Sequence, residues 1–302
     1  MKKILAMLLA LVMILSLAAC ASTPAADTPA ESTSTTETPV TETPASAEET
    51  PAAEGKTYTV GVCQLVQHEA LDAATQGFVD ALTEELGDAV TIDVQNASGD
   101  SVNCGTIVNG FVSRGVDLIM ANATPALTAA VSATADIPIL GTSITAYGVA
   151  LDLDDFNGTV GGNVSGTSDL ADLQKQAQMI LDWFPETKNV GLLFCSAEPN
   201  SRYQIDEVRK ALEAQGVTCE EFAFTDSNDV SSVTQKAADF SDVVYIPTDN
   251  TAASNTEAIA NILIPAGVPA ICGEEGLCRG CGVATLSISY YDLGVTTGKM
   301  AA

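Results

Sequence analysis

Short apolar runs alternate with amphipathic helical patterns from residue 57 to the end of the chain. This alternation predicts βαβ units, in which parallel strands form a sheet that helices bury on both faces. The predicted strands are 57–65, 89–97, 116–123, 137–143, 189–197, 218–224, 243–247, 268–272 and 282–289. The predicted helices are 71–86, 101–115, 125–135, 170–183, 199–215, 229–239, 251–264 and 290–302.

One Gly-, Asn- and Asp-rich stretch, at 147–168, interrupts this alternation. An interruption between two similar α/β runs predicts two Rossmann-like lobes with parallel sheets, joined at a hinge. We place lobe 1 at 57–160 and lobe 2 at 161–287. A single large doubly wound sheet is the alternative. The last helical pattern is still running at Ala302, so we expect more chain to follow.

The N-terminal segment has the order of a secretory signal. Residues 1–20 carry Lys2 and Lys3, then an apolar run, then Leu17-Ala18-Ala19-Cys20. The last four residues resemble the lipobox of bacterial lipoproteins, which makes Cys20 the predicted lipidation site; a cleaved signal with a chance cysteine is the alternative. Residues 21–56, rich in Thr, Pro, Ala and Glu, predict a disordered tether. We therefore expect an extracytoplasmic domain that a lipid anchors to the cell membrane.

Charge and cysteine content narrow the possible functions. The chain has 12 basic and 39 acidic residues, a formal net charge of −27, which argues against a nucleic-acid partner. Seven cysteines follow Cys20, an odd number, so at least one thiol has no partner within the chain. Cys63 and Cys195 lie in apolar runs and are expected in the core. The cluster at Cys272, Cys278 and Cys281 could be a disulfide, a redox pair, free thiols or part of a zinc site. Because a fourth zinc ligand is not evident nearby, no metal is predicted.

Small polar residues follow several predicted strands, at the edge where open α/β sheets bind ligands. The Thr124-Pro125 pair is typical of a helix start, whose free N–H groups can bind an anion, although on sequence alone a plain helix cap that needs no ligand is the favoured interpretation. Asp249-Asn250 and Asn200-Ser201 have the same two interpretations. The chain has one histidine, His68, and no nucleophile elbow, phosphate-binding loop or zinc-protease motif. We therefore predict no catalytic residues and no cofactor.

Six segments occur in an order and spacing that resemble a known family: "VGVCQLVQHEALDAATQGFVDALTEELG", "NATPAL", "NVSGTSDL", "PTDNTAAS", "GEEG" and "ISYYDLG". They resemble the ABC-transporter substrate-binding lipoproteins of the tryptophan or aromatic amino-acid type, from about Thr57 to the end. The resemblance implies the type I periplasmic-binding-protein fold, with two lobes that close on a small ligand. It also implies that the chain returns to lobe 1 at 288–302, and that a further helix and strands follow.

The same resemblance implies a ligand site. Thr124, Thr142 and Ser143 would donate hydrogen bonds to the carboxylate of an amino acid, while Asp249, with Asn250, would bind its ammonium group. The remaining candidates for the lining are Gln64, His68, Asp169, Asn200, Ser201, Glu275 and Tyr290. Tyr147 or Tyr290 could stack on an aromatic ligand. The chain departs from the family where "ITAYG" replaces the usual Thr-Asp-Pro, and where cysteines cluster at 272–281.

These features predict a lipoprotein that captures an aromatic or hydrophobic amino acid by hinge closure, without catalysis. Its expected partners are the ligand, a membrane permease driven by a cytoplasmic ATPase, and the membrane itself through the lipid anchor. A monomer is expected. The alternatives are a binding protein for a sugar or nucleoside, a sensory receptor ectodomain and a surface hydrolase.

Overall fold

The computed structural model describes residues 56–302. The predicted signal peptide, Cys20 and all but the last residue of the predicted tether lie outside the described residues. In the part of the chain that is described, no helix is long and apolar enough to cross a membrane.

The first sheet has five parallel strands in the order β2-β1-β3-β4-β5. In β1, the neighbouring residues Val62 and Cys63 face opposite sides of the sheet, and both are fully buried, in separate apolar clusters. This is the double-sided burial that a parallel sheet requires. The elements are β1 (Tyr58–Gln64), α1 (Glu69–Leu86), η1 (Gly87–Ala89), β2 (Val90–Asn96), α2 (Ser101–Arg114), β3 (Leu118–Asn122), α3 (Thr124–Ala133), β4 (Ile139–Ile144), α4 (Tyr147–Ala150) and β5 (Val164–Ser168).

The second sheet repeats this arrangement, in the order β10-β9-β8-β6-β7. Leu193 and Phe194 of β6 are buried in different clusters on the two faces. The elements are α5 (Leu173–Trp183), β6 (Asn189–Cys195), α6 (Pro199–Glu213), β7 (Thr218–Phe224), α7 (Val230–Phe240), β8 (Val243–Ile246), α8 (Asn250–Ala253), α9 (Thr256–Ala266), β9 (Ala270–Cys272), α10 (Glu275–Cys281) and β10 (Ala284–Thr285).

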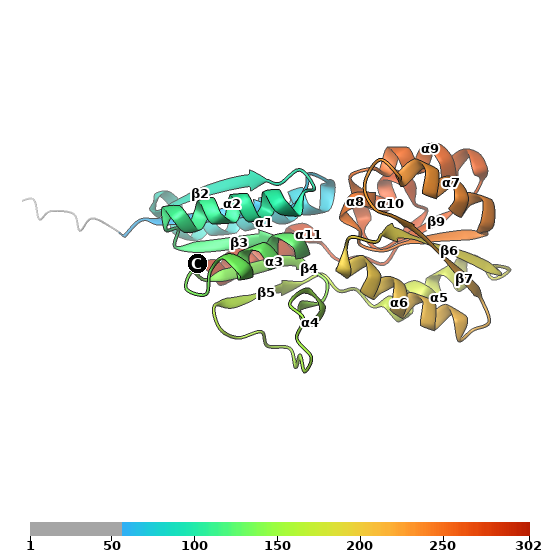
Figure 1. Cartoon of the computed structure of the whole chain (residues 1–302), viewed down its shortest axis with the longest axis horizontal. Coiled ribbons are helices and arrows are strands. Elements are labelled where there is room, and N and C mark those ends of the chain that lie inside the picture. The colour runs from blue at the N-terminus through green and yellow to red at the C-terminus, as the bar shows by residue number, and fades with distance from the viewer. Residues whose placement is uncertain (1–55) are drawn as a thin grey trace, which may run out of the picture. The chain divides into compact units, whose positions relative to one another are not determined.

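The last helix, α11 (Tyr290–Ala301), returns to the first sheet and packs along α1. Figure 1 shows its red ribbon among the blue and green elements of that sheet. Two glycines allow the close approach, Gly77 of α1 and Gly294 of α11, because a Cβ atom at either would overlap the backbone of the other helix. The packing of α11 against α1 therefore holds the end of the described chain on the first lobe.

The predicted fold class, two α/β lobes with parallel sheets, is confirmed, and the alternative of one large sheet is wrong. The expected boundary after residue 160 is too early, because β5 pairs with β4 in the first sheet. The sequence missed β5 because Ser165, Gly166 and Thr167 carry no apolar signal, and the strand lies at the edge of the sheet.

Three other elements differ from their predictions. The expected helix 251–264 is divided into α8 and α9, because Asn255 turns its side chain back to the Thr251 carbonyl oxygen. Only Ala284 and Thr285 of the expected strand 282–289 pair with a neighbour. The short helix α10 stands where no helix was predicted.

The seven cysteines of residues 56–302 are free thiols, and five of them are buried. Cys63 and Cys195 lie in the core, as expected from their apolar strands. Cys272 ends β9, while Cys278 and Cys281 lie on α10. Among the described residues, no group of three or more His, Cys, Asp and Glu side chains could hold a metal ion.

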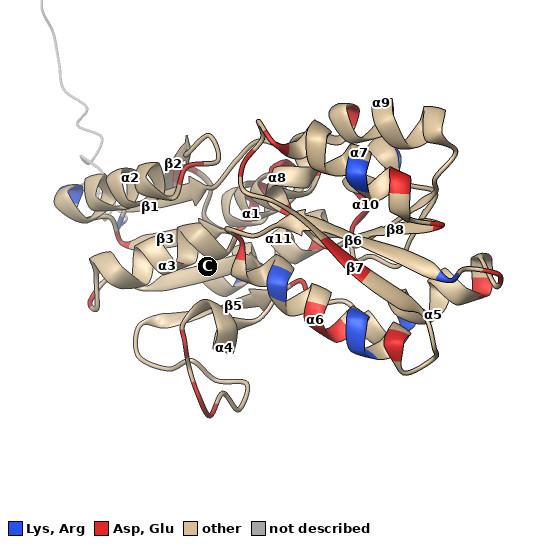
Figure 2. Ribbon diagram, turned by 45° about the vertical axis from the view of Figure 1, so that its right-hand side comes forward, with Lys and Arg blue, Asp and Glu red and all other residues tan. Residues whose placement is uncertain are grey.

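Acidic residues outnumber basic residues in this chain. Figure 2 shows Lys and Arg spread thinly among more numerous Asp and Glu. On α6, Arg202 and Arg209 both bind Glu221 of the neighbouring strand β7. These ion pairs join α6 to the edge strand of the second sheet.

Candidate functional site

Both sheets reverse their strand order at their centre, beside β1 and β3 in the first and β6 and β8 in the second. The carboxyl ends of strands at such a reversal are the usual ligand sites of open α/β sheets. Residues from these ends and from nearby turns enclose a small space of about 10 Å³, which we call the inner cavity. Its lining is His68, Leu71, Ser143, Thr145, Asp169, Asn200, Thr248, Asp249, Asn250, Ala253, Glu274 and Tyr290.

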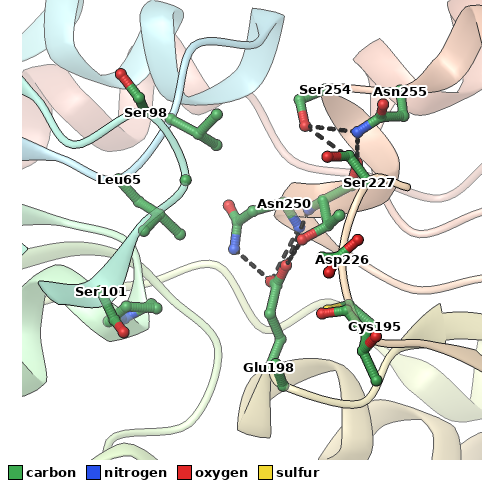
Figure 3. A pocket seen from close by; sticks show the side chains of 16 residues that line it. Leu65, Ser98, Ser101, Cys195, Glu198, Asp226, Ser227, Asn250, Ser254 and Asn255 are labelled. Atoms are coloured by element: carbon green, nitrogen blue, oxygen red, sulfur yellow. Dashed lines mark hydrogen bonds between the residues drawn. The ribbon is translucent and has the colours of Figure 1, made fainter. Parts of the chain in front are cut away.

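A larger space of about 290 Å³, the outer groove, adjoins the inner cavity and shares Asn250 with it. Figure 3 looks into this groove, with Leu65, Ser98 and Ser101 of the first lobe on one side and Glu198 and Asn250 of the second on the other.

Four buried polar atoms with no hydrogen-bond partner line the inner cavity. They are His68 Nδ1, Ser143 Oγ, Asp169 Oδ1 and Asn200 Oδ1. In the described residues, nine side-chain atoms are unpartnered in this way, and the other five belong to residues outside the cavity. A buried polar atom without a partner is unfavourable unless a ligand completes it. The clustering therefore marks the inner cavity, rather than the outer groove, as the candidate binding site.

Asp169 supplies one of these atoms from the segment that leaves β5. The Tyr290 hydroxyl donates a hydrogen bond to Asp169 Oδ2 at 2.7 Å, whereas Oδ1 has no partner. Burial raises the pKa of Asp169, against the lowering effects of hydrogen bonding with Tyr290, with the nearby Thr145 hydroxyl and with its own backbone N–H. A cation that reached Oδ1 would stabilise the charged carboxylate.

Ser143 supplies the second atom, from an irregular part of β4. The pairing of β4 with β5 shifts register between Gly141 and Ile144, and Ser143 has a φ of 56°. A residue in the left-handed region is strained, and bulges of this kind re-aim side chains beside binding sites. The bulge in β4 therefore contains Ser143, whose buried hydroxyl group has no hydrogen-bond partner at the cavity.

His68 and Asn200 complete the set, one from each lobe. His68 precedes α1, and its Nε2 lies 3.2 Å from Asn250 Oδ1 of the second lobe. Asn200, in the first turn of α6, donates to the Thr248 carbonyl oxygen at 3.1 Å. An ion pair between Glu69 and Arg279 also joins α1 to α10.

Asp249 lines the same cavity, but both of its oxygens are engaged. Oδ1 accepts a hydrogen bond from the Ala252 N–H at 2.8 Å and so caps α8, while Oδ2 accepts one from the Cys195 N–H at 2.6 Å. The side chain therefore ties the end of β6 to the start of α8. Burial, together with the charge of Glu198, raises the pKa of Asp249 to about 8.

Glu198, which the sequence did not select, bridges the same two segments. Its carboxylate accepts hydrogen bonds from the backbone N–H groups of Asn250 and Thr251, at 3.0 and 2.9 Å. The side chains of Asn250 and Thr251 donate to it at 2.7 and 2.8 Å. Figure 3 shows this carboxylate pointing at Asn250 on the second-lobe side of the groove. Its acceptor capacity is used within the protein.

Seven of the twelve predicted ligand residues line the inner cavity: His68, Ser143, Asp169, Asn200, Asp249, Asn250 and Tyr290. The other five, Gln64, Thr124, Thr142, Ser201 and Glu275, do not. The Gln64 amide bonds to Val66, Asp72 and Thr75 within its own lobe.

The other four predicted residues that do not line the cavity contact other parts of the protein. Thr142 joins Thr167 and Thr297 in a group of hydroxyls between β4, β5 and α11. Thr124 begins α3, Ser201 is buried in α6 beside Asn200, and Glu275 is exposed and paired with Arg279. Tyr147, considered for stacking, donates to the carbonyl oxygens of Gly141 and Thr167.

Five cavity residues were absent from the predicted set: Leu71, Thr145, Thr248, Ala253 and Glu274. Thr248 and Glu274 follow strands, so their position was a usable signal. Leu71 and Ala253 look like ordinary core positions of helices. The Glu274 carboxylate caps α10 through the Gly276 and Leu277 N–H groups, and burial raises its pKa.

Several known proteins are similar to this chain in sequence and fold. A tyrosine-binding protein of Clostridioides difficile (strain R20291) is 33% identical over 263 residues, which cover 85% of this chain and 75% of that protein. The ABC domain from Streptococcus pneumoniae in complex with L-Trp is 34% identical, with a TM-score of 0.78 over 82% of this chain and 84% of that one.

A ligand-free, open structure of a substrate-binding protein with adhesive properties from Clostridium difficile is 36% identical, with a TM-score of 0.58 over 81% of this chain and 84% of that one. The predicted type I periplasmic-binding-protein fold is confirmed by these neighbours. Residues 59–302 match the family described as ABC transporter substrate binding protein. The chain therefore belongs to the ABC transporter substrate-binding protein family.

Proposed function

We propose that this protein is the extracytoplasmic, lipid-anchored binding component of an ABC importer, and that it captures an aromatic amino acid in the inner cavity. The observation that carries the proposal is the group of four unpartnered polar atoms around one enclosed space. At about 10 Å³, the space has room for about one water molecule as it stands, so an amino acid would enter it only when the lobes separate.

The polar atoms suit a zwitterion. Asp169 Oδ1 is a carboxylate oxygen ready to accept from an ammonium group, and Ser143 Oγ is a hydroxyl that can donate to a carboxylate. Leu71, Ala253 and Tyr290 provide apolar surface for a side chain. We therefore reassign the ammonium partner from Asp249, each of whose oxygens already accepts one hydrogen bond, to Asp169, whose Oδ1 accepts none.

Two kinds of relative support the choice of an aromatic ligand, because one is named for tyrosine and the other holds L-Trp. The TM-scores, 0.78 with the L-Trp complex and 0.58 with the ligand-free open structure, support the proposal that the lobes stand here in the closed arrangement. The contacts His68–Asn250 and Glu69–Arg279 would then be bonds that closure makes. A ligand that touches both lobes would stabilise that state.

The division into lobes and the membrane context are parts of the same proposal. We assign residues 57–168 and 288–302 to lobe 1 and the segment between them to lobe 2. The lipobox at Leu17-Ala18-Ala19-Cys20 supports lipidation of Cys20, and residues 21–56 would act as the tether. The partners would be a permease and its ATPase, with the protein acting as a monomer.

A thermal-shift and calorimetry screen of the purified full-length protein tests this function. The ligands are the twenty amino acids, common hexoses and nucleosides. We expect the melting temperature to rise with aromatic amino acids, because a ligand that binds the native state stabilises it by mass action. A shift with sugars or nucleosides and none with any aromatic amino acid would refute the proposal.

A further inference from the structure

Asp169 Oδ1 and Ser143 Oγ suit the two charged groups of a zwitterion, and Asn200 Oδ1 and His68 Nδ1 are two further acceptors at the same cavity. The hydrogen bonds of the residues that carry the unpartnered atoms form two separate groups. Asn200 and His68 belong to the group built on Glu198 and Asn250, whereas Asp169 bonds to Tyr290. In the described residues, no hydrogen bond joins one group to the other. An ammonium group has three N–H donors, but the separation of the two groups favours a second donor of the ligand as the partner of Asn200 Oδ1 and His68 Nδ1.

The network fixes the chemistry of Asn200. Its amide nitrogen donates to the Thr248 carbonyl oxygen at 3.1 Å and lies 3.3 Å from Glu198 Oε2. A backbone carbonyl oxygen can only accept, so the nitrogen must be on that side of the amide. The opposite atom, the unpartnered Oδ1, is an acceptor at the cavity, and the residue is only 5% exposed.

The network also fixes the tautomer of His68. Asn250 donates through Nδ2 to Glu198 Oε2 at 2.7 Å, so Asn250 Oδ1 is an acceptor and His68 Nε2 must carry the hydrogen. Burial lowers the pKa of His68, against smaller opposing effects of the Asn250 hydrogen bond and of Glu198 and Asp72. In the resulting neutral ring, the buried Nδ1 has a lone pair and no hydrogen. It is a second acceptor without a donor.

We propose that Asn200 Oδ1 and His68 Nδ1 form an acceptor pair that recognises a hydrogen-bond donor on the ring of the ligand. The site would then select a ring that carries a phenol O–H or an indole N–H, and reject the otherwise similar ring of phenylalanine. This inference rests on the proposed function. An unsubstituted ring would exclude water from both acceptors without offering a hydrogen-bond donor in its place. Sites that form a hydrogen bond with a donor of the substrate discriminate strongly against analogues that lack this donor.

Calorimetry with L-tyrosine, L-tryptophan and L-phenylalanine, on the full-length protein at pH 7.5, tests the inference. We expect at least one of the donor-bearing ligands to bind at least roughly tenfold more tightly than phenylalanine. Asn200→Leu keeps the size of the side chain but removes the acceptor. It should weaken the donor-bearing ligands and leave phenylalanine unchanged or tighter, so that the ratio of Kd values falls.

His68→Phe is a second variant with the same expected loss of ratio. Asn103→Leu, an exposed change on α2, is the control and should alter neither affinity nor ratio. If all three ligands bind the wild-type protein within about threefold, or if Asn200→Leu weakens all three equally, the inference is wrong while the proposed function stands. If no aromatic amino acid binds at all, the proposed function is wrong and the inference fails with it.

Discussion

Asp249 in the second lobe and Asp169 beside the hinge line the same cavity, but their carboxylate oxygens are engaged differently. Both are buried, and burial raises the pKa of both. Asp249 accepts a backbone N–H at each oxygen, whereas Asp169 accepts the Tyr290 hydroxyl at one oxygen and nothing at the other. A carboxylate at a strand end can therefore complete the scaffold or await a ligand, and its unused acceptor capacity distinguishes the two cases.

Asp169→Asn should have the largest effect, and the effect should be on binding. Removing one partner of a buried charge pair costs about 2–5 kcal/mol, because the other charge is left desolvated without compensation. The affinity for the preferred amino acid should fall roughly thirtyfold or more, as measured by calorimetry. The melting temperature of the ligand-free variant serves as the folding control. An affinity within threefold of wild type would show that Asp169 does not bind the ammonium.

Asp249→Asn is the matched change at the other carboxylate, and it should act on stability. One oxygen becomes an amide NH2, which faces a backbone N–H that has lost its acceptor. An unsatisfied buried donor of this kind costs about 1–3 kcal/mol, which urea unfolding of the ligand-free protein would detect. Affinity should change much less than in Asp169→Asn. Loss of affinity without loss of stability would reverse the roles assigned to the two residues.

Thr142→Val tests a predicted carboxylate donor that lies outside the cavity. The variant removes the hydroxyl that bonds to Thr167 and Thr297, while those two remain bonded to each other at 2.9 Å. We expect the free energy of unfolding to fall by about 0.5–1.5 kcal/mol, the net worth of an ordinary hydrogen bond. Affinity should stay within about twofold. A tenfold weaker affinity would return Thr142 to the binding site.

Acidification should have the smallest effect, and His68 should contribute to it beside Asp169 and Asp249, whose pKa values burial raises. Burial in the closed arrangement lowers the pKa of His68, so the closed protein binds fewer protons than the open one below about pH 6.5. Closure is therefore fully favourable above that pH and weakens as the pH falls. Affinity should decline less than tenfold between pH 7.5 and 5.5. In His68→Gln, which cannot titrate there, the decline should be smaller, and an unchanged pH profile would exclude His68 as its source.

Much of the fold follows from local signals in the sequence. Alternating apolar runs and helical patterns predicted both parallel sheets, because each signal lies within one element. The edge strand β5 escaped because its residues are polar and its pairing with β4 depends on Gly166, which lies too close to the Gly141 backbone for any side chain. Such a strand is defined by its neighbour rather than by its own composition.

The sequence predicted the position of the cavity, but not the hydrogen bonding of the residues that line it. Strand ends and family motifs brought seven residues to the cavity, including Asp169, Asn200 and Tyr290. They could not reveal which oxygens are already bonded. The bond of Asp249 to the Ala252 N–H is a local helix cap, whereas its bond to the Cys195 N–H joins residues that are distant in sequence and appears only in the fold. The hydrogen bonds of each candidate, which require the structure, separate the scaffold from the binding groups.

A crystal structure of the protein with L-tyrosine or L-tryptophan, whichever binds more tightly, tests the central claim most directly. The ammonium nitrogen should lie about 2.7–2.9 Å from Asp169 Oδ1, the distance of a charge-assisted hydrogen bond, with the ligand in the inner cavity. The bonds of Asp249 to Cys195 and Ala252 should be unchanged. An ammonium group bound to Asp249, or a ligand seated in the outer groove, would contradict the assignment.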